Sequence, residues 1–190
     1  MRVDPISWWS AEFNAVAPVG HALRNHLADR WTRFHSLPES KRYPEDVAER
    51  EELLKRHLAV AGELFEVGEA IFVYRCHLGE RRLKGKQKHQ IASRQLQEKM
   101  VRLPAELHAG EEDDYYCVRA LMTSWVPDFF ELLTRQVAEW EESGVTFVSL
   151  STKNVYSPYD GGMDVFPMSI SPRTLEAKFR SWMSVRGDKL

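Results

Sequence analysis

The chain has 190 residues, which is enough for one domain and few for two. Its 26 lysines and arginines nearly balance its 28 aspartates and glutamates, so the formal charge is −2. This balance argues against a protein that coats nucleic acid, because such proteins gain affinity by neutralising phosphates. It also argues against a disordered acidic tail.

The N-terminal segment has no apolar core of a secretory signal, because Asp4, Pro5 and Glu12 interrupt it. No stretch approaches the roughly 20 apolar residues that a membrane-spanning helix needs. We therefore expect a cytoplasmic protein with no membrane partner. Cys76 and Cys117 lie far apart, and in a reducing cytosol we expect them to be buried, free thiols.

The first half of the chain alternates helical and strand patterns. Apolar periodicity predicts helices over the first 30 or so residues, and the alternation in residues 31–36 (WTRFHS) predicts a short strand. Pro44 suits a first helical turn, and the apolar stripe that follows predicts a helix over about 44–66. Residues 69–77, rich in aromatic and β-branched side chains, predict a second strand.

Residues 78–112 have few apolar side chains, and their basic and acidic residues are segregated. A thin apolar stripe predicts a helix over 87–101. We expect the whole segment to be a charged, less ordered excursion from the core.

The second half of the chain returns to regular patterns. Residues 115–125 predict a strand, and Pro127 begins a strongly amphipathic helix that Gly144 closes. The aromatic residues of this stripe, Trp140 included, are expected in the core. Further strands are expected at 145–150, 154–157 and 163–168, followed by a helix after Ser171 and Pro172.

This order of elements predicts an α+β fold. We expect residues 1–190 to form a single domain, with a mixed sheet of about five or six strands packed by amphipathic helices. The strand order cannot be deduced from these patterns.

The most unusual string is the proline-flanked segment from Phe34 to Pro44. Its prolines reduce the entropy lost on ordering, so its side chains are candidates for a rigid ligand or partner platform. In particular, Lys41 and Arg42 would contact an anionic ligand or a partner. In the alternative interpretation, Ser36 and Glu39 form a capping box around a short helical turn, and the two cations are merely solvated.

The segment 158–164 (PYDGGMD) has the residues of a tight turn, because Gly161 and Gly162 tolerate positive φ and Asp160 can bond to the turn backbone. A functional alternative uses Asp160 and Asp164 as metal ligands or acid–base carboxylates. Two carboxylates without a calcium-loop pattern do not make a metal site. We therefore expect a turn, no metal and no cofactor.

The sequence has no nucleophile-elbow, P-loop or dinucleotide motif. A basic stretch offers an electrostatic footprint for phosphate backbones, although it lacks interleaved aromatic residues and an acidic stretch follows it. Its cations are Arg81, Arg82, Lys84, Lys86 and Lys88.

Three strings together resemble an uncharacterised bacterial domain-of-unknown-function family. They are RFHSLPESKRYP (33–44), YSPYDGGMDVF (156–166) and FRSWMSVRGDKL (179–190), and the resemblance covers about 31–66 and 115–190. The resemblance implies a small bacterial cytoplasmic protein and adds no chemistry. Its motif residues are the candidate binding residues: Arg33, His35, Glu39, Lys41, Arg42, Tyr159, Asp160 and Asp164.

We therefore expect a non-enzymatic protein that binds a protein partner, in the manner of small bacterial immunity or accessory proteins, with recognition on its exterior. The first alternative is a nucleic-acid-associated protein that uses the basic residues of 75–102. The second is an enzyme whose site lies near His35 and the turn at Asp160. That enzyme requires His35, Glu39 and one of the two aspartates to converge.

Overall fold

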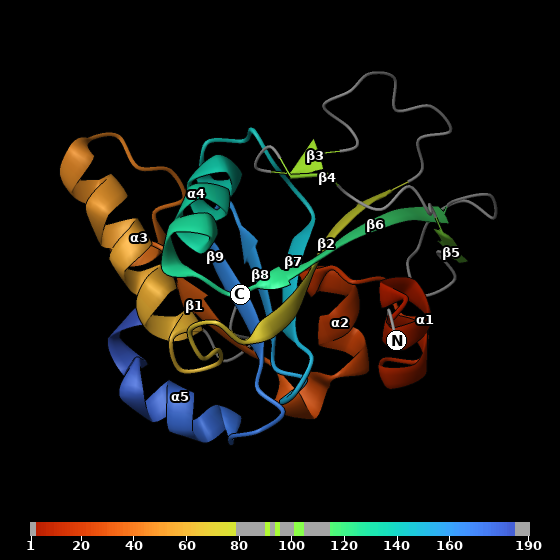
Figure 1. Ribbon diagram of the computed structural model, residues 1–190. Coiled ribbons are helices and arrows are strands. Elements are labelled where there is room, and N and C mark those ends of the chain that lie inside the picture. The colour runs from red at the N-terminus through yellow and green to blue at the C-terminus, as the bar shows by residue number, and fades with distance from the viewer. Residues whose placement is uncertain (1–2, 79–89, 92–93, 96–100, 105–114, 185–190) are drawn as a thin grey trace.

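The computed structural model describes residues 3–78, 90–91, 94–95, 101–104 and 115–184 (Figure 1). Its helices are α1 (Pro5–Glu12), α2 (Gly20–His26), α3 (Val47–Ala61), α4 (Pro127–Ala138) and α5 (Pro172–Lys178). Its strands are β1 (Thr32–His35), β2 (Ala70–Leu78), β3 (Gln90–Ile91), β4 (Arg94–Gln95), β5 (Val101–Pro104), β6 (Tyr115–Ser124), β7 (Val145–Ser149), β8 (Val155–Tyr159) and β9 (Gly162–Phe166).

The α+β class with amphipathic helices on a sheet is confirmed. The main sheet has the strand order β1-β9-β8-β7-β2-β6-β5, and each neighbouring pair is antiparallel. We expected a mixed sheet of about five or six strands, but this sheet is antiparallel throughout. It also has one more strand, β5, which pairs with β6 in a region where no strand was predicted. That residues 1–190 form one domain stays a prediction.

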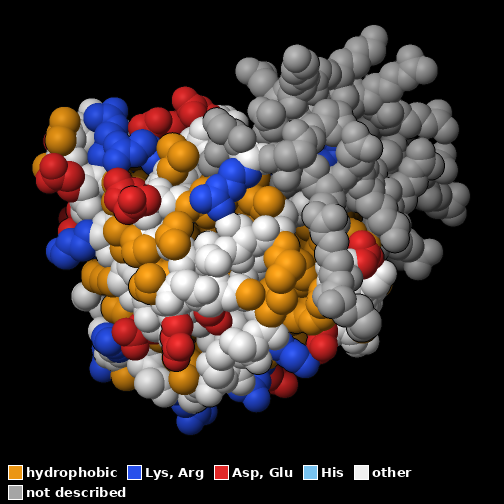
Figure 2. Space-filling model, viewed as in Figure 1, with side chains coloured by type: hydrophobic (Ala, Val, Ile, Leu, Met, Phe, Trp, Pro, Cys, Tyr) orange, Lys and Arg blue, Asp and Glu red, His pale blue; other side chains and the backbone are white. Residues whose placement is uncertain are grey.

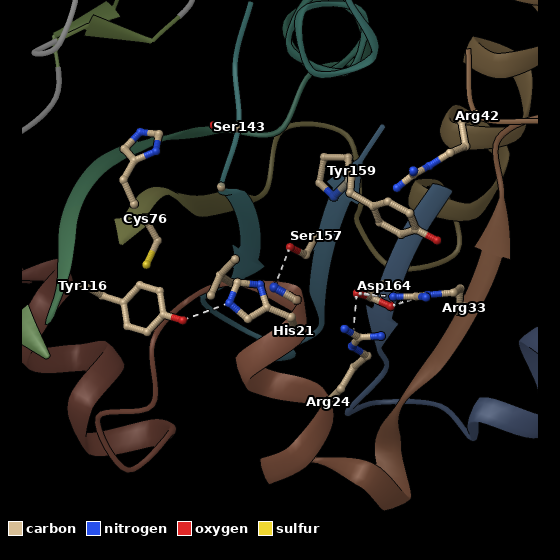
Figure 3. Close-up of a pocket in the computed structure, with 15 residues that line it drawn as sticks. His21, Arg24, Arg33, Arg42, Cys76, Tyr116, Ser143, Ser157, Tyr159 and Asp164 are labelled. Atoms are coloured by element: carbon tan, nitrogen blue, oxygen red, sulfur yellow. Dashed lines mark hydrogen bonds and ion pairs between the residues drawn. The ribbon is translucent and has the colours of Figure 1, made fainter. Parts of the chain in front are cut away.

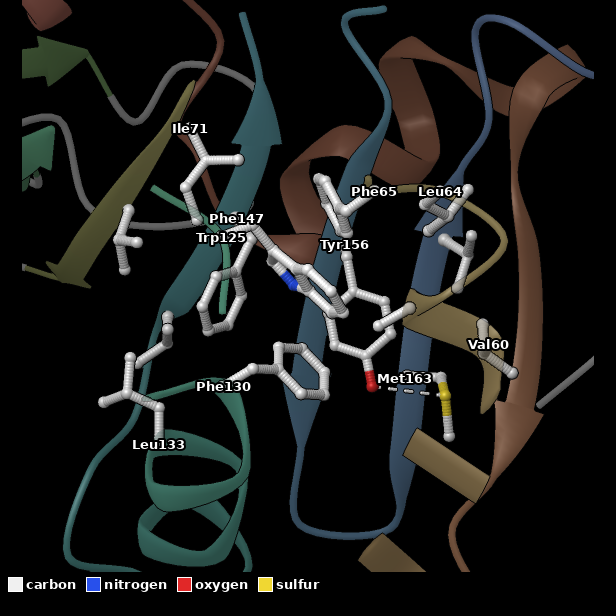
Figure 4. Packing of buried hydrophobic residues seen from close by; sticks show 14 of the residues in the cluster. Val60, Leu64, Phe65, Ile71, Trp125, Phe130, Leu133, Phe147, Tyr156 and Met163 are labelled. Atoms are coloured by element: carbon white, nitrogen blue, oxygen red, sulfur yellow. Dashed lines mark hydrogen bonds between the residues drawn. The ribbon is translucent and has the colours of Figure 1, made fainter. Parts of the chain in front are cut away.

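Helices cover both faces of the sheet, with α3, α4 and α5 on one face and α1 and α2 on the other (Figure 1). Because successive side chains of a strand point to opposite faces, the central strands contribute to two cores. On β2, Val73 packs into the first core and Phe72 into the second. Phe130, Phe147 and Tyr156 meet at the centre of the first core (Figure 4).

The helix expected over 44–66 is shorter, because Asp46 is the N-cap of α3 and its carboxylate accepts a hydrogen bond from Glu49 N. Similarly, α4 ends at Ala138 and not at Gly144. The chain then turns through a left-handed residue, Trp140 (φ 63°), whose side chain is 66% exposed. The expectation that Trp140 belongs to the core is therefore wrong.

The prediction of a helix over 87–101 is also wrong for the described residues of this range, because β3 and β4 form an antiparallel pair there. The stripe that suggested it places Ile91 and Leu96 five residues apart, which departs from the helical period. Ile91 is buried in the first core, and the Arg94 guanidinium lies 4.0 Å from the ring centroid of Phe129. Most of the predicted excursion (78–112) falls outside the described residues.

Figure 2 shows acidic and basic side chains interspersed over the surface formed by α3 and α4. Among the described helices, none combines the length and the apolar character needed to cross a membrane.

A polar network lies inside the first core, where His57 of α3 is 2% exposed. Ser36 Oγ lies 2.8 Å from His57 Nε2, and Tyr156 Oη lies 2.6 Å from His57 Nδ1. Both ring nitrogens therefore have a partner while the imidazole is neutral. Burial, assisted by the nearby charge of Arg56, lowers the pKa of His57 to about 3.

This pKa predicts acid sensitivity, with a defined sign. Above the ordinary histidine pKa of 6.5, His57 is neutral in the folded and unfolded chains. As the pH falls from 6.5 towards 3, the unfolded chain takes up a proton that the folded chain resists. Stability therefore falls with decreasing pH, at up to about 1.4 kcal/mol per pH unit from this group.

Urea unfolding at pH values from 7.5 to 5 measures this change in stability. Carboxylates contribute less to the pH dependence of the unfolding free energy in this range. The glutamine of His57→Gln can still donate and accept hydrogen bonds, but it does not titrate. The unfolding free energy of this variant should therefore vary less with pH than that of the wild type. An equal pH dependence in both proteins would contradict the assignment to His57.

Candidate functional site

A pocket of about 610 Å³ opens on the sheet face that carries α1 and α2 (Figure 3). Its lining combines side chains of β8 and β9, residues at the start of α2, and part of β2 and β6. Arg33 of β1, Arg42 and the Ser143–Gly144 segment complete it. Recognition was expected on the exterior alone, whereas this volume is typical of a ligand pocket.

An ion pair between Arg33 and Asp164 lies at one end of the pocket. These residues face each other across β1 and β9, and Arg33 Nε and Nη2 donate to Asp164 Oδ1 and Oδ2 at 2.9 and 3.1 Å. Trp31 Nε1 also donates to Oδ1, at 2.8 Å. The Asp164 residue is 3% exposed, so the two-point pairing satisfies a carboxylate that is almost fully withdrawn from water.

The same carboxylate fixes the position of α2. Gly20 approaches so closely that a Cβ atom there would lie 2.5 Å from Asp164 Oδ2. Gly20 N donates to Ser157 Oγ at 3.1 Å, and Ser157 Oγ lies 3.0 Å from the hydroxyl of Thr146. This contact brings Arg24, one turn later, to 3.8 Å from Asp164, an ion pair longer than a hydrogen bond.

Tyr159 lies beneath the Arg33 guanidinium, which is 4.7 Å from the centroid of its ring. Burial raises the pKa of Tyr159 to about 12. The phenol is therefore protonated at neutral pH and acts there as a hydrogen-bonding group, not as a base.

Arg42 lines the pocket from the proline-flanked segment, and its side chain is 64% exposed. Its Nη2 atom lies 3.3 Å from Asp160 Oδ2, which also accepts a hydrogen bond from the Tyr43 hydroxyl at 3.1 Å. The neighbouring Lys41 instead binds Glu49 of α3, with Nζ 2.7 Å from Oε1. The two cations predicted to act together thus point to different partners.

The remaining candidates do not join the pocket. His35 Nε2 lies 3.1 Å from Ser40 Oγ, and burial lowers the pKa of His35. Glu39 is exposed in a left-handed conformation (φ 56°). In the described part of the chain, no hydrogen bond or ion pair joins His35 or Glu39 to Asp160 or Asp164. The convergence that the enzyme alternative requires is absent there.

The predicted capping box is also absent, since Ser36 is committed to His57 and the 3-10 turn Pro38–Ser40 has no side-chain cap. The Asp160–Gly161 segment is a hairpin turn as expected, and Asp164 lies in β9, within the strand expected over 163–168. Periodicity within a short sequence window does not reveal which strands pair, so it could not separate the roles of these two aspartates.

At the other end of the pocket, His21 Nε2 lies 2.9 Å from the Tyr116 hydroxyl (Figure 3). Cys76 is beside them, and burial raises the pKa of its thiol. Cys76 and Cys117 are both buried thiols, as expected. Sequence reasoning missed His21, Arg24 and Tyr116, because a seven-residue helix and a strand interior contain no motif that distinguishes them.

Among the described residues, no three His, Cys, Asp or Glu side chains are placed to hold a metal ion. The pocket's fixed charges are those of Arg24, Arg33, Arg42 and Asp164, with Asp160 adjoining Arg42. Because guanidinium groups present several N–H donors in a planar fork, this excess of cations suits a carboxylate or phosphate group.

The five cations of the nucleic-acid alternative (Arg81, Arg82, Lys84, Lys86 and Lys88) lie outside the described residues.

Two comparisons with known proteins found nothing: no curated protein and no solved structure matches the chain. A family model described as a domain of unknown function, DUF3885, matches residues 19–186. The matched range includes every residue that lines the pocket.

The pairing in the pocket predicts unequal costs for removing its two aspartates. Asp164→Ala leaves Arg33 buried without its partner and should lower the unfolding free energy by about 3–5 kcal/mol. Asp160→Ala removes an ion pair with an Arg42 side chain that is 64% exposed, and should cost about 0–1 kcal/mol. Chemical denaturation of the two variants measures both values, and similar losses would contradict this account of the pocket.

Proposed function

The chain belongs to the DUF3885 family, and we propose that it is a non-enzymatic binding protein that receives carboxylate groups of an acidic protein partner in this pocket. The observation that carries the proposal is that, among the described residues, three arginines and only one buried aspartate line the same pocket. The carboxylate of Asp164 neutralises the charge of Arg33 directly, whereas Arg24 Nε lies 3.8 Å from Asp164 Oδ2. The side chain of Arg42 is largely exposed.

These contacts leave guanidinium donors of Arg24 and Arg42 for an incoming anion. A carboxylate that binds them forms charge-assisted hydrogen bonds, which are stronger than neutral ones. The site also needs little rearrangement, because the Arg33–Asp164 pair and the Gly20–Ser157 hydrogen bond already hold the strands and helix that position the arginines.

Binding is favoured over catalysis by the state of three titratable groups of the pocket, Asp164, Tyr159 and Cys76. Asp164 already accepts three hydrogen bonds from Arg33 and Trp31, so its carboxylate is held mainly by these structural partners. The high pKa values of Tyr159 and Cys76 keep both groups protonated at neutral pH. These groups can hold a ligand, but at neutral pH they are poor bases and nucleophiles.

A protein ligand is favoured over a nucleic acid by the overall charge of −2, which gives no long-range attraction to a polyanion. Arginine is moreover enriched among the residues that dominate protein–protein binding energies. The attraction is therefore local to the pocket and suits a short acidic segment.

The test is titration of the protein with a capped peptide of three glutamates flanked by serines. We expect the peptide to bind, and the double variant Arg24→Gln/Arg42→Gln to weaken it at least about tenfold, since a hydrogen bond to a charged group contributes roughly 1.5–3 kcal/mol. A peptide with lysines in place of the glutamates should not bind.

Arg135→Gln is the matched control, because Arg135 is 44% exposed and pairs with Glu131 on α4, away from the pocket. It should leave the affinity unchanged. Inorganic phosphate and a single-stranded oligonucleotide complete the series. Tighter binding of either one, or equal affinity in all variants, would contradict a site for protein carboxylates.

A further inference from the structure

Trp140 occupies a position in which a large side chain is unusual. It follows the C-cap of α4, Glu139, and has a left-handed backbone (φ 63°). The carbonyl of Gln136 accepts hydrogen bonds from Glu141 N and Glu142 N at 2.9 and 3.1 Å, which closes the helix end. This left-handed position is most often glycine, because other residues meet a steric penalty there.

Burial of the indole ring does not explain this choice, since Trp140 is 66% exposed. Its ring centroid lies 5.8 Å from that of Tyr43, which is itself 41% exposed. Exposed aromatic residues of this kind are enriched at protein–protein interfaces and among their energetically dominant residues. We call this pair, Tyr43 and Trp140, the aromatic platform.

The aromatic platform is connected to the pocket from two sides. The Tyr43 hydroxyl donates to Asp160 Oδ2, and the same oxygen pairs with Arg42, which lines the pocket. Ser143, which also lines the pocket, follows Trp140 by three residues. The proline-flanked segment and the end of α4 thus hold the two rings beside the exposed arginine of the pocket.

We propose that the aromatic platform receives an apolar side chain of the same partner segment whose carboxylate enters the pocket. This inference rests on the proposed function, and it specifies the partner further: an acidic segment with a large apolar residue next to its acids. The arginines would then provide charge complementarity, and the two rings would provide apolar contact area with few rotatable bonds.

The backbone of Trp140 offers a variant that separates binding from stability. Trp140→Gly removes the indole ring but favours the left-handed conformation, so the fold should be kept. We expect a denaturation midpoint equal to or above that of the wild type. Leu132→Ala is the control, because Leu132 is an exposed apolar residue (44%) on α4, outside the pocket and the aromatic platform.

The experiment compares two capped peptides of equal charge, three glutamates flanked by leucines and three glutamates flanked by serines. We expect the leucine peptide to bind the wild type about tenfold more tightly, a gain that an apolar side chain can supply on burial. Trp140→Gly should abolish this gain and leave the affinity for the serine peptide unchanged. Leu132→Ala should preserve the gain.

The two proposals fail in different ways. The proposal for the aromatic platform is overturned if both peptides require Arg24 and Arg42 but bind equally, or if Trp140→Gly retains the gain in affinity for the leucine peptide. The proposal for the pocket then stands. If the leucine peptide binds independently of both arginines, the pocket is overturned, and with it the continuous surface inferred here. If neither peptide binds, both proposals are overturned.

Discussion

The carboxylate of Asp164 is the group on which the arrangement of this face depends. It pairs with Arg33 across the β1–β9 ladder, accepts a hydrogen bond from Trp31 and lies against Gly20 at the start of α2. An edge strand and a short helix, each with little capacity to stabilise itself, are thus held by the same buried charge. Because an unpaired buried charge is costly, these contacts are mutually dependent, and they also determine where Arg24 and Arg33 lie in the pocket.

Local patterns in the sequence predicted most of the fold, because strand alternation and helix periodicity need only neighbouring residues. The β8–β9 hairpin and β1 follow from such patterns. Arg33 and Asp164 were both candidates, but their pairing depends on which strands adjoin, and 131 residues separate them. Gly20 was not identified at all, since the need for a residue without a side chain arises only when α2 meets β9.

The errors of the sequence analysis also have physical causes. The apolar stripe of α4 continues to Trp140 in the sequence, but the helix ends at Ala138 and the ring leaves the core. A chain of hydrogen bonds joins Ser36, His57 and Tyr156. It resembles a reactive arrangement, but all three residues are buried. Hydrogen bonding of a buried histidine on both sides fixes the orientation of its ring and specifies the packing of α3 against β8.

The position of β1 at the edge of the sheet, beside β9, has a consequence for synthesis of the protein. Arg24, Arg33 and Arg42 leave the ribosome before their partners Asp160 and Asp164, which follow more than a hundred residues later in the β8–β9 hairpin. Loop closure over such a separation carries an entropic cost, and contacts of this kind form slowly. A nascent chain therefore displays these cations without a pocket until β8 and β9 have been synthesised, so competence for ligand recognition arises only after these strands emerge.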